Sequence, residues 1–117
     1  MKKKRTSLAL YNYYKKDYAK YLLLIKRKNK LITYSIDAKI ISFLFKIDYV
    51  EEIILDNTLF NDLLELKEIY HFNIAVVDSK IREYYCHKLS DYLRLKNKSK
   101  KYVKELENVE YGEKWFL

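Results

Sequence analysis

The chain has 117 residues, 50% of them hydrophobic, which fits one domain with a real core and excludes disorder throughout. Its 24 lysines and arginines against 16 acidic residues give a net charge of +8, which favours polyanionic partners, although an AT-rich genome would also enrich Lys, Asn, Ile and Tyr. No window approaches the ~18 uninterrupted apolar residues of a membrane span, and the basic start lacks the apolar stretch of a secretory signal.

The first elements in chain order are a helix and a hairpin. Residues 8–20 predict a helix, because Leu8, Tyr11 and Tyr18 recur at helical spacing. Residues 21–26 and 30–36 predict two antiparallel strands. The turn between them is centred on Lys28-Asn29, where Asn tolerates the left-handed backbone that hairpin turns require.

A helix, a strand and a second helix come next. Asp37 is the expected N-cap of a buried helix over residues 38–45, which is apolar on most sides. Residues 51–55 predict a short strand. Asp56 or Asn57 is expected to cap an amphipathic helix over residues 58–70.

The last third of the chain is predicted as strand, helix and basic tail. Residues 72–77 form a Val- and Ile-rich run with little polar alternation, as in a central strand. Asp78 or Ser79 is expected to cap a helix from residue 80 to about residue 95. A basic segment and a last helix or tail ending in Trp115-Phe116-Leu117 follow.

This order predicts a single α/β domain over residues 1–117, with a mixed sheet, an N-terminal antiparallel hairpin and crossover helices. A basic arm (residues 1–7) precedes the domain body, and a basic, helical segment (residues 94–117) ends it.

Two blocks carry a family resemblance. Residues 22–38, LLLIKRKNKLITYSIDA, resemble the N-terminal mismatch-recognition domain of the MutS DNA repair family, whose consensus there is approximately LLFFRVGDFYELFGEDA. Residues 59–78, LFNDLLELKEIYHFNIAVVD, are similar to the family's amphipathic helix and following GYKVAICEQ-type strand. The resemblance implies a fold like the MutS N-terminal domain, in which the edge formed by the hairpin would contact DNA.

The departures from the family are as informative. The family's mismatch-reading Phe-x-Glu is replaced here by Lys30 and Ile32, which neither wedge into a base stack nor accept a hydrogen bond from a base. The family's ATPase, lever and clamp regions are absent, and one glycine makes no phosphate loop. The resemblance therefore implies a stand-alone version in which mismatch reading is lost and positive charge remains.

Phosphate contact is the expected chemistry of the basic segments, with duplex DNA as the main expected nucleic acid and the arm at residues 2–5 assisting. Lysines at a hairpin tip also simply stay solvated and discourage strand-to-strand aggregation, and that alternative stays open. The residues expected to bind nucleic acid are Lys26, Arg27, Lys28 and Lys30 on the hairpin, and Arg94, Lys96, Lys98, Lys100 and Lys101 on the late segment.

Metal and cofactor chemistry is not expected. The strong transition-metal ligands are His71, Cys86 and His87, and the last two are adjacent, so that their side chains diverge on a helix. Because Cys86 is the only cysteine, the chain forms no intramolecular disulfide, and a reducing, cytoplasmic compartment is expected.

A nuclease is the main catalytic alternative that the residues offer. Such an enzyme uses acids to hold Mg²⁺ and a lysine to help activate water. The chain offers these residue types in Asp56 with Asp78-Ser79-Lys80, or in Asp37-Ala38-Lys39. The same acids make good helix N-caps, so we expect no enzyme activity. Likewise the tyrosines of the first helix offer either a base-stacking platform or, more simply, a half-buried face.

Two functions remain open. One is a small non-catalytic nucleic-acid-binding accessory protein. The alternative is a protein-interaction module of a phage or mobile element that inhibits or recruits an acidic or nucleoprotein partner, with Trp115 and Phe116 either in an exposed patch for that partner or folded onto the core. A shared face for the two basic segments would favour nucleic acid.

Overall fold

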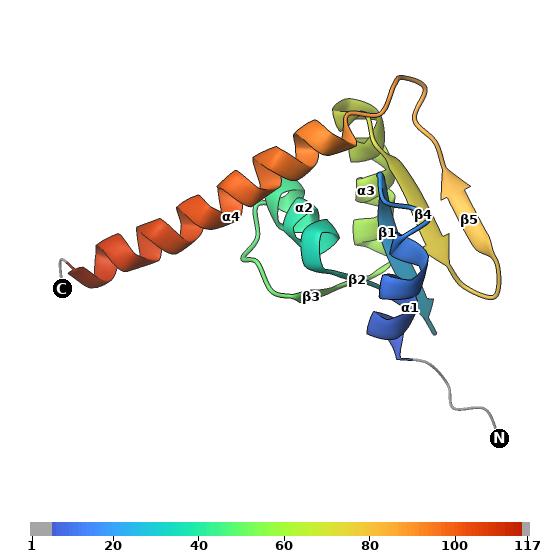
Figure 1. Ribbon diagram of the computed structural model, residues 1–117, viewed down its shortest axis with the longest axis horizontal. Helices are drawn as coiled ribbons and strands as arrows, with labels where there is room; N and C mark the ends of the chain where they lie inside the picture. Colours follow the sequence, from blue (N-terminus) through green and yellow to red (C-terminus); the bar gives the residue numbers. More distant parts are fainter. Residues whose placement is uncertain (1–5, 116–117) are drawn as a thin grey trace.

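Five strands form one mixed sheet in the order β3-β2-β1-β4-β5, and helices lie on both of its faces (Figure 1). The computed structural model describes residues 6–115, with side chains described for residues 6–107. The helices are α1 (Ser7–Lys15), α2 (Ser35–Phe45), α3 (Asn57–Tyr70) and α4 (Tyr92–Trp115). The strands are β1 (Tyr21–Arg27), β2 (Lys30–Tyr34), β3 (Glu52–Leu55), β4 (Asn73–Val77) and β5 (Ile81–Tyr84). The α/β class with a mixed sheet is as predicted.

The predicted hairpin is confirmed. β1 and β2 pair antiparallel, with Ile25 opposite Ile32 and Arg27 opposite Lys30. The turn residue that adopts the left-handed backbone is Lys28, with φ 57°, and not the Asn29 beside it. Since αL backbone is disfavoured for most side chains, the pairing of the two buried strands must hold this turn in place.

The predicted central strand is also confirmed. β4 runs parallel to β1 and antiparallel to β5, so it lies inside the sheet. Alternate side chains of β1 then face opposite layers: Leu22 and Leu24 pack towards the core under α2, α3 and α4, whereas Leu23 and Ile25 pack towards α1. Burial on both faces explains why these strands are continuously apolar in sequence.

The helix caps were predicted with mixed success. Asp56 caps α3 as expected, its Oδ1 accepting from the backbone N–H of Leu59 at 2.9 Å. The prediction for Asp37 is wrong, because α2 begins at Ser35 and Asp37 lies inside its first turn, fully buried. The first helix ends at Lys15 instead of residue 20, and Thr6 caps its start.

The predicted helix over residues 80–95 is wrong as well. Residues 81–84 are strand β5, which pairs with β4, and α4 begins only at Tyr92. Asp78 caps no helix; its N–H donates to the Lys80 carbonyl at 2.9 Å in the β4–β5 turn. The apolar residues from Ile81 onward recur at a spacing that also fits a helix. However, the edge of β4 that faces away from β1 needs a hydrogen-bonding partner, and the short turn after β4 lets β5 pair with it.

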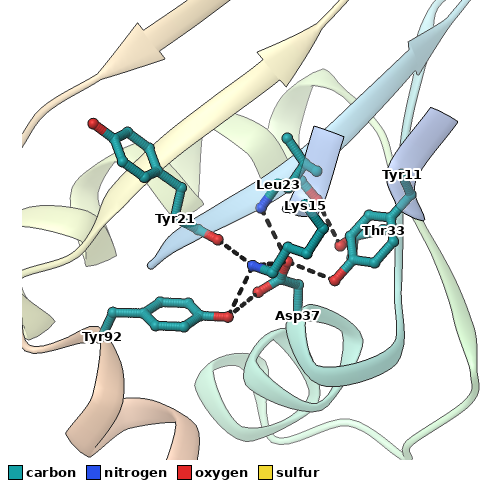
Figure 2. Close-up of polar contacts among 7 residues, drawn as sticks. All are labelled: Tyr11, Lys15, Tyr21, Leu23, Thr33, Asp37 and Tyr92. Atoms are coloured by element: carbon teal, nitrogen blue, oxygen red, sulfur yellow. Dashed lines mark hydrogen bonds and ion pairs between the residues drawn. The ribbon is translucent and has the colours of Figure 1, made fainter. Parts of the chain in front are cut away.

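Asp37 is instead the centre of a buried polar cluster (Figure 2). Its Oδ2 accepts hydrogen bonds from the Tyr11 hydroxyl at 2.7 Å, from Lys15 Nζ at 2.8 Å and from the Leu23 N–H at 3.2 Å. Its Oδ1 accepts from the Tyr92 hydroxyl at 2.6 Å. Lys15 Nζ also donates to the Tyr92 hydroxyl and to the Tyr21 carbonyl, so the cluster joins α1, β1, α2 and α4.

Removing the Asp37 carboxylate should destabilise the fold strongly. Asp37→Ala leaves a partly buried ammonium without its counter-ion and two buried hydroxyls without their acceptor, which predicts a loss of about 3–5 kcal/mol in the free energy of unfolding. Urea denaturation measures it, with Asp62→Ala on the exposed side of α3 as the matched control, expected to change stability by less than about 0.5 kcal/mol. Similar costs for the two variants would contradict this role of Asp37.

The cluster should also make the fold sensitive to alkali. Burial, and then the charge of Asp37, raise the pKa of Tyr11 and of Tyr92 above the usual 10.0, so both hydroxyls stay protonated in the folded state where they would ionise in the unfolded chain. Their stabilisation is full below pH 10 and is lost as pH rises above it.

Lys15 acts in the opposite direction, because burial lowers its pKa, and its contribution rises with pH until 10.5 and is then constant. Above pH 10.5 only the tyrosine effect remains. We expect the urea midpoint to fall between about pH 10.5 and 11.5, and to fall less in the Tyr11→Phe/Tyr92→Phe double variant. An equal fall in both proteins would count against the buried hydroxyls as its cause.

Candidate nucleic-acid interface

One edge of the sheet collects the turns of two hairpins. The register places Ile25 of β1 beside Val77 of β4, and Val77 opposite Ile81 of β5, so the β1–β2 and β4–β5 turns leave the sheet side by side. This edge also holds the end of β3 and the start of α3, since Leu55 pairs with Leu31. The cations of the two hairpins form what we call the basic edge: Lys26, Arg27, Lys28, Lys30, Lys80 and Arg82.

The basic edge is largely open to solvent. Lys26, Lys28, Lys30, Lys80 and Arg82 are exposed, and Arg27 is half-buried. The Arg27 guanidinium donates from Nε to the Ser7 Oγ at 3.0 Å, which fixes the start of α1 beside the hairpin. The basic arm that precedes Thr6 lies outside the described residues.

A small pocket opens between the two hairpins and the start of α3. Its volume is about 100 Å³, and we call it the edge pocket. The apolar or aromatic residues in its lining are buried or half-buried, whereas the polar residues are exposed and form its rim. The lining residues are Leu31, Phe60, Val76 and Tyr84 together with Lys26, Asn29, Asn57, Asp78 and Arg82.

Acidic groups offset part of the positive charge at this edge. Asp78 Oδ2 lies 3.9 Å from Lys26 Nζ, and both side chains are about half exposed, so the pair is loose and screened by solvent. Asp56 is occupied by its capping bond to Leu59. Six cations against these two carboxylates leave the edge positive.

The late basic segment lies elsewhere. Tyr92 begins α4 beside Tyr21, the first residue of β1, because Lys15 Nζ bonds to both of them. The hairpin turn is at the other end of β1, six residues or about 20 Å away. Figure 1 shows α4 leaving the sheet at the end opposite the hairpin and running along α2. The structure therefore does not bring Arg94, Lys96, Lys98, Lys100 and Lys101 onto one face with the hairpin lysines.

The other predicted sites fall as follows. Trp115 is the last residue of α4, but its side chain and all of Phe116 lie outside the described residues. Tyr11 is buried against Asp37, so it does not belong to an open stacking platform. Tyr14 and Tyr18 pack partly against the α1 side of the sheet, as a half-buried face does.

The candidate catalytic and metal groups are mostly engaged in structural contacts. Asp37 is saturated by protein donors, Asp56 caps α3, and Asp78 pairs with Lys26. Across residues 6–107, no three His, Cys, Asp or Glu side chains come together as a metal site would need. Nor does any helix within the described part of the chain combine the length and apolarity needed to cross a bilayer.

Lys80 and Arg82 are the cations of the basic edge that the sequence analysis did not predict there. The sequence motif Asp78-Ser79-Lys80 suggests only nuclease chemistry for Lys80, and the helix predicted from residue 80 to about residue 95 includes Arg82. The alternation of Lys80 and Arg82 with Ile81, directly after the turn-forming Asp78-Ser79, is the signal of a strand leaving a tight turn. That signal predicts two cations beside the β1–β2 hairpin.

Comparison with known proteins adds no relative. The chain matches no family model, no curated protein and no solved structure.

Proposed function

We propose that the protein is a non-catalytic nucleic-acid-binding protein of the cell interior that contacts phosphates along the basic edge. One observation carries the proposal: two hairpins, separate in sequence, place their cations on the same edge of the sheet. Strands β2, β1, β4 and β5 are spaced by about 4.8 Å, so these cations span about 15 Å. Duplex DNA presents one charge per 1.7 Å of its axis, so several phosphates fall within that span.

The resemblance to the MutS N-terminal domain enters the proposal only through the hairpin. In that family the corresponding edge meets DNA, and here Lys30 is exposed on it whereas Ile32 is half-buried on the α1 side of the sheet. Neither side chain reads a base. We therefore propose binding to backbone phosphates without mismatch recognition, and expect matched and mismatched duplexes to bind within about a factor of two.

A protein partner is the second candidate, and a different end of the molecule favours it. Leu89 is 93% exposed and Ile69 67% exposed. The Asp91 N–H donates to the His71 carbonyl at 2.6 Å, so the loop that contains Leu89 lies beside the end of α3, which carries Ile69. An acidic or nucleoprotein partner of a phage or mobile-element system would meet this apolar surface and the nearby lysines of α4.

The salt dependence of DNA binding tests the proposed function. Each phosphate neutralised on duplex DNA adds about −0.9 to the slope of log affinity against log salt, so removing three contacts should flatten the slope by about 3. The test variant is Lys26→Ser/Lys28→Ser/Lys30→Ser, which leaves the Arg27–Ser7 bond in place. Fluorescence polarisation at several salt concentrations gives the slope.

A matched triple variant on α4 provides the control. Arg94→Ser/Lys98→Ser/Lys101→Ser removes the same charge from exposed positions at the other end of the sheet, so the slope should stay close to that of the unmodified protein. A larger effect of the α4 variant would refute the basic edge as the binding surface. If no salt-dependent DNA binding is observed, the proposed nucleic-acid function is wrong and the protein-interaction alternative is favoured.

A further inference from the structure

The edge pocket is more than a gap between basic side chains. Its inner lining comes from Leu31, Val76, Phe60 and Tyr84, and the Phe60 and Tyr84 rings pack edge to face with centroids 5.6 Å apart. This ring pair fixes one wall of the pocket. An apolar interior with a few polar groups at the rim is the usual composition of a small-ligand site.

We propose that the edge pocket binds a phosphomonoester group, which on nucleic acid is the terminal phosphate of a strand. The inference deepens the proposed function and rests on it for the source of the phosphate. The shared chemistry is a tetrahedral dianion, and inorganic phosphate or a small phosphomonoester offers the same group.

Charge is the first reason. Lys26 and Arg82 come to the pocket from different hairpins, and a guanidinium and an ammonium on opposite sides suit an oxyanion with several acceptor oxygens. Lys26 is held by a loose contact with Asp78 at 3.9 Å, in which both side chains are about half exposed. An incoming dianion can therefore recruit Lys26 at little cost.

Size is the second reason. A pocket of about 100 Å³ is well below the ~300 Å³ lower limit of drug-sized ligand sites, so it admits a group no larger than a phosphate or a single ring. A phosphodiester inside a strand carries a sugar on each side, which hinders its entry into so small a pocket. A terminal phosphate has one free side and carries an extra negative charge at neutral pH, so it fits and is attracted more strongly.

The polar residues at the rim are compatible with such a ligand. The side-chain amides of Asn29 and Asn57 each provide donors. Asn57 is the first residue of α3, so the partial positive charge of this helix end adds to the field of the two cations. Asp78 is the one carboxylate among the described lining residues, and it opposes anion binding.

The test compares strands that differ only at their end. Oligonucleotides with a 5′-phosphate, a 3′-phosphate or hydroxyl ends are titrated against the full chain by fluorescence polarisation. A phosphate end should bind about tenfold more tightly than the hydroxyl-ended strand, as expected for one strong charge-assisted contact. Arg82→Gln should abolish that preference, whereas the control Arg94→Gln on α4 should keep it.

A substitution of Asp78 should change the preference for a phosphate end in the opposite direction to Arg82→Gln. Asp78→Asn removes the opposing charge and should strengthen the preference for a phosphate end several-fold, a gain that unfolding cannot produce. Circular dichroism checks that each variant is folded. If Asp78→Asn weakened the preference, the pocket would not be an anion site and the inference would be overturned.

Inorganic phosphate alone separates this inference from the proposed function. In an NMR titration, amide shifts confined to the pocket residues support the inference even if no oligonucleotide binds, in which case a small phosphomonoester is the ligand and the proposed function fails. Hydroxyl-ended and phosphate-ended strands that bind equally, with no shifts from inorganic phosphate, overturn the inference and leave the proposed function standing.

Discussion

The fold depends on one buried carboxylate. Four donors from three other elements converge on Asp37 of α2: the Tyr11 hydroxyl and Lys15 Nζ of α1, the Leu23 N–H of β1 and the Tyr92 hydroxyl of α4. A buried charge without partners would cost several kcal/mol, so only an arrangement that delivers all four donors tolerates Asp37 in the core. The same contacts fix how α1 and α4 lie relative to the sheet, which apolar packing alone specifies less sharply.

The position of this cluster determines where the basic segments go. Tyr92 is held beside the start of β1, so α4 begins there and runs along α2, carrying its lysines away from the hairpin (Figure 1). The other end of β1 is not covered by α4; it carries the two hairpin turns, the end of β3 and the start of α3. The edge that the polar cluster leaves uncovered is thus the edge where the hairpin cations and the edge pocket meet.

Local patterns in the sequence were sufficient for the elements whose burial is periodic or continuous. β1, β2, β4 and α3 were predicted because apolar runs and the Asp56 cap are local signals. The role of Asp37 was not predictable in this way, because its partners are 14 to 55 residues away and an Asp before a helix normally caps it. β5 was not predicted, because its apolar spacing also fits a helix. As a result, the sequence did not show that Lys80 and Arg82 lie beside the first hairpin. Charge alone led to the prediction for the hairpin lysines, but no local signal showed that α4 would carry its lysines to the other end of the sheet.

The proposed function requires nucleic acid to contact the protein at the basic edge, where the two hairpins turn. The most direct measurement is amide chemical-shift mapping of the full chain on addition of a short duplex at moderate salt. We expect the largest shifts in residues 26–30, 56–60 and 78–82, with residues 85–104 little affected. Shifts concentrated in residues 85–104, with the two hairpin turns unchanged, would contradict it.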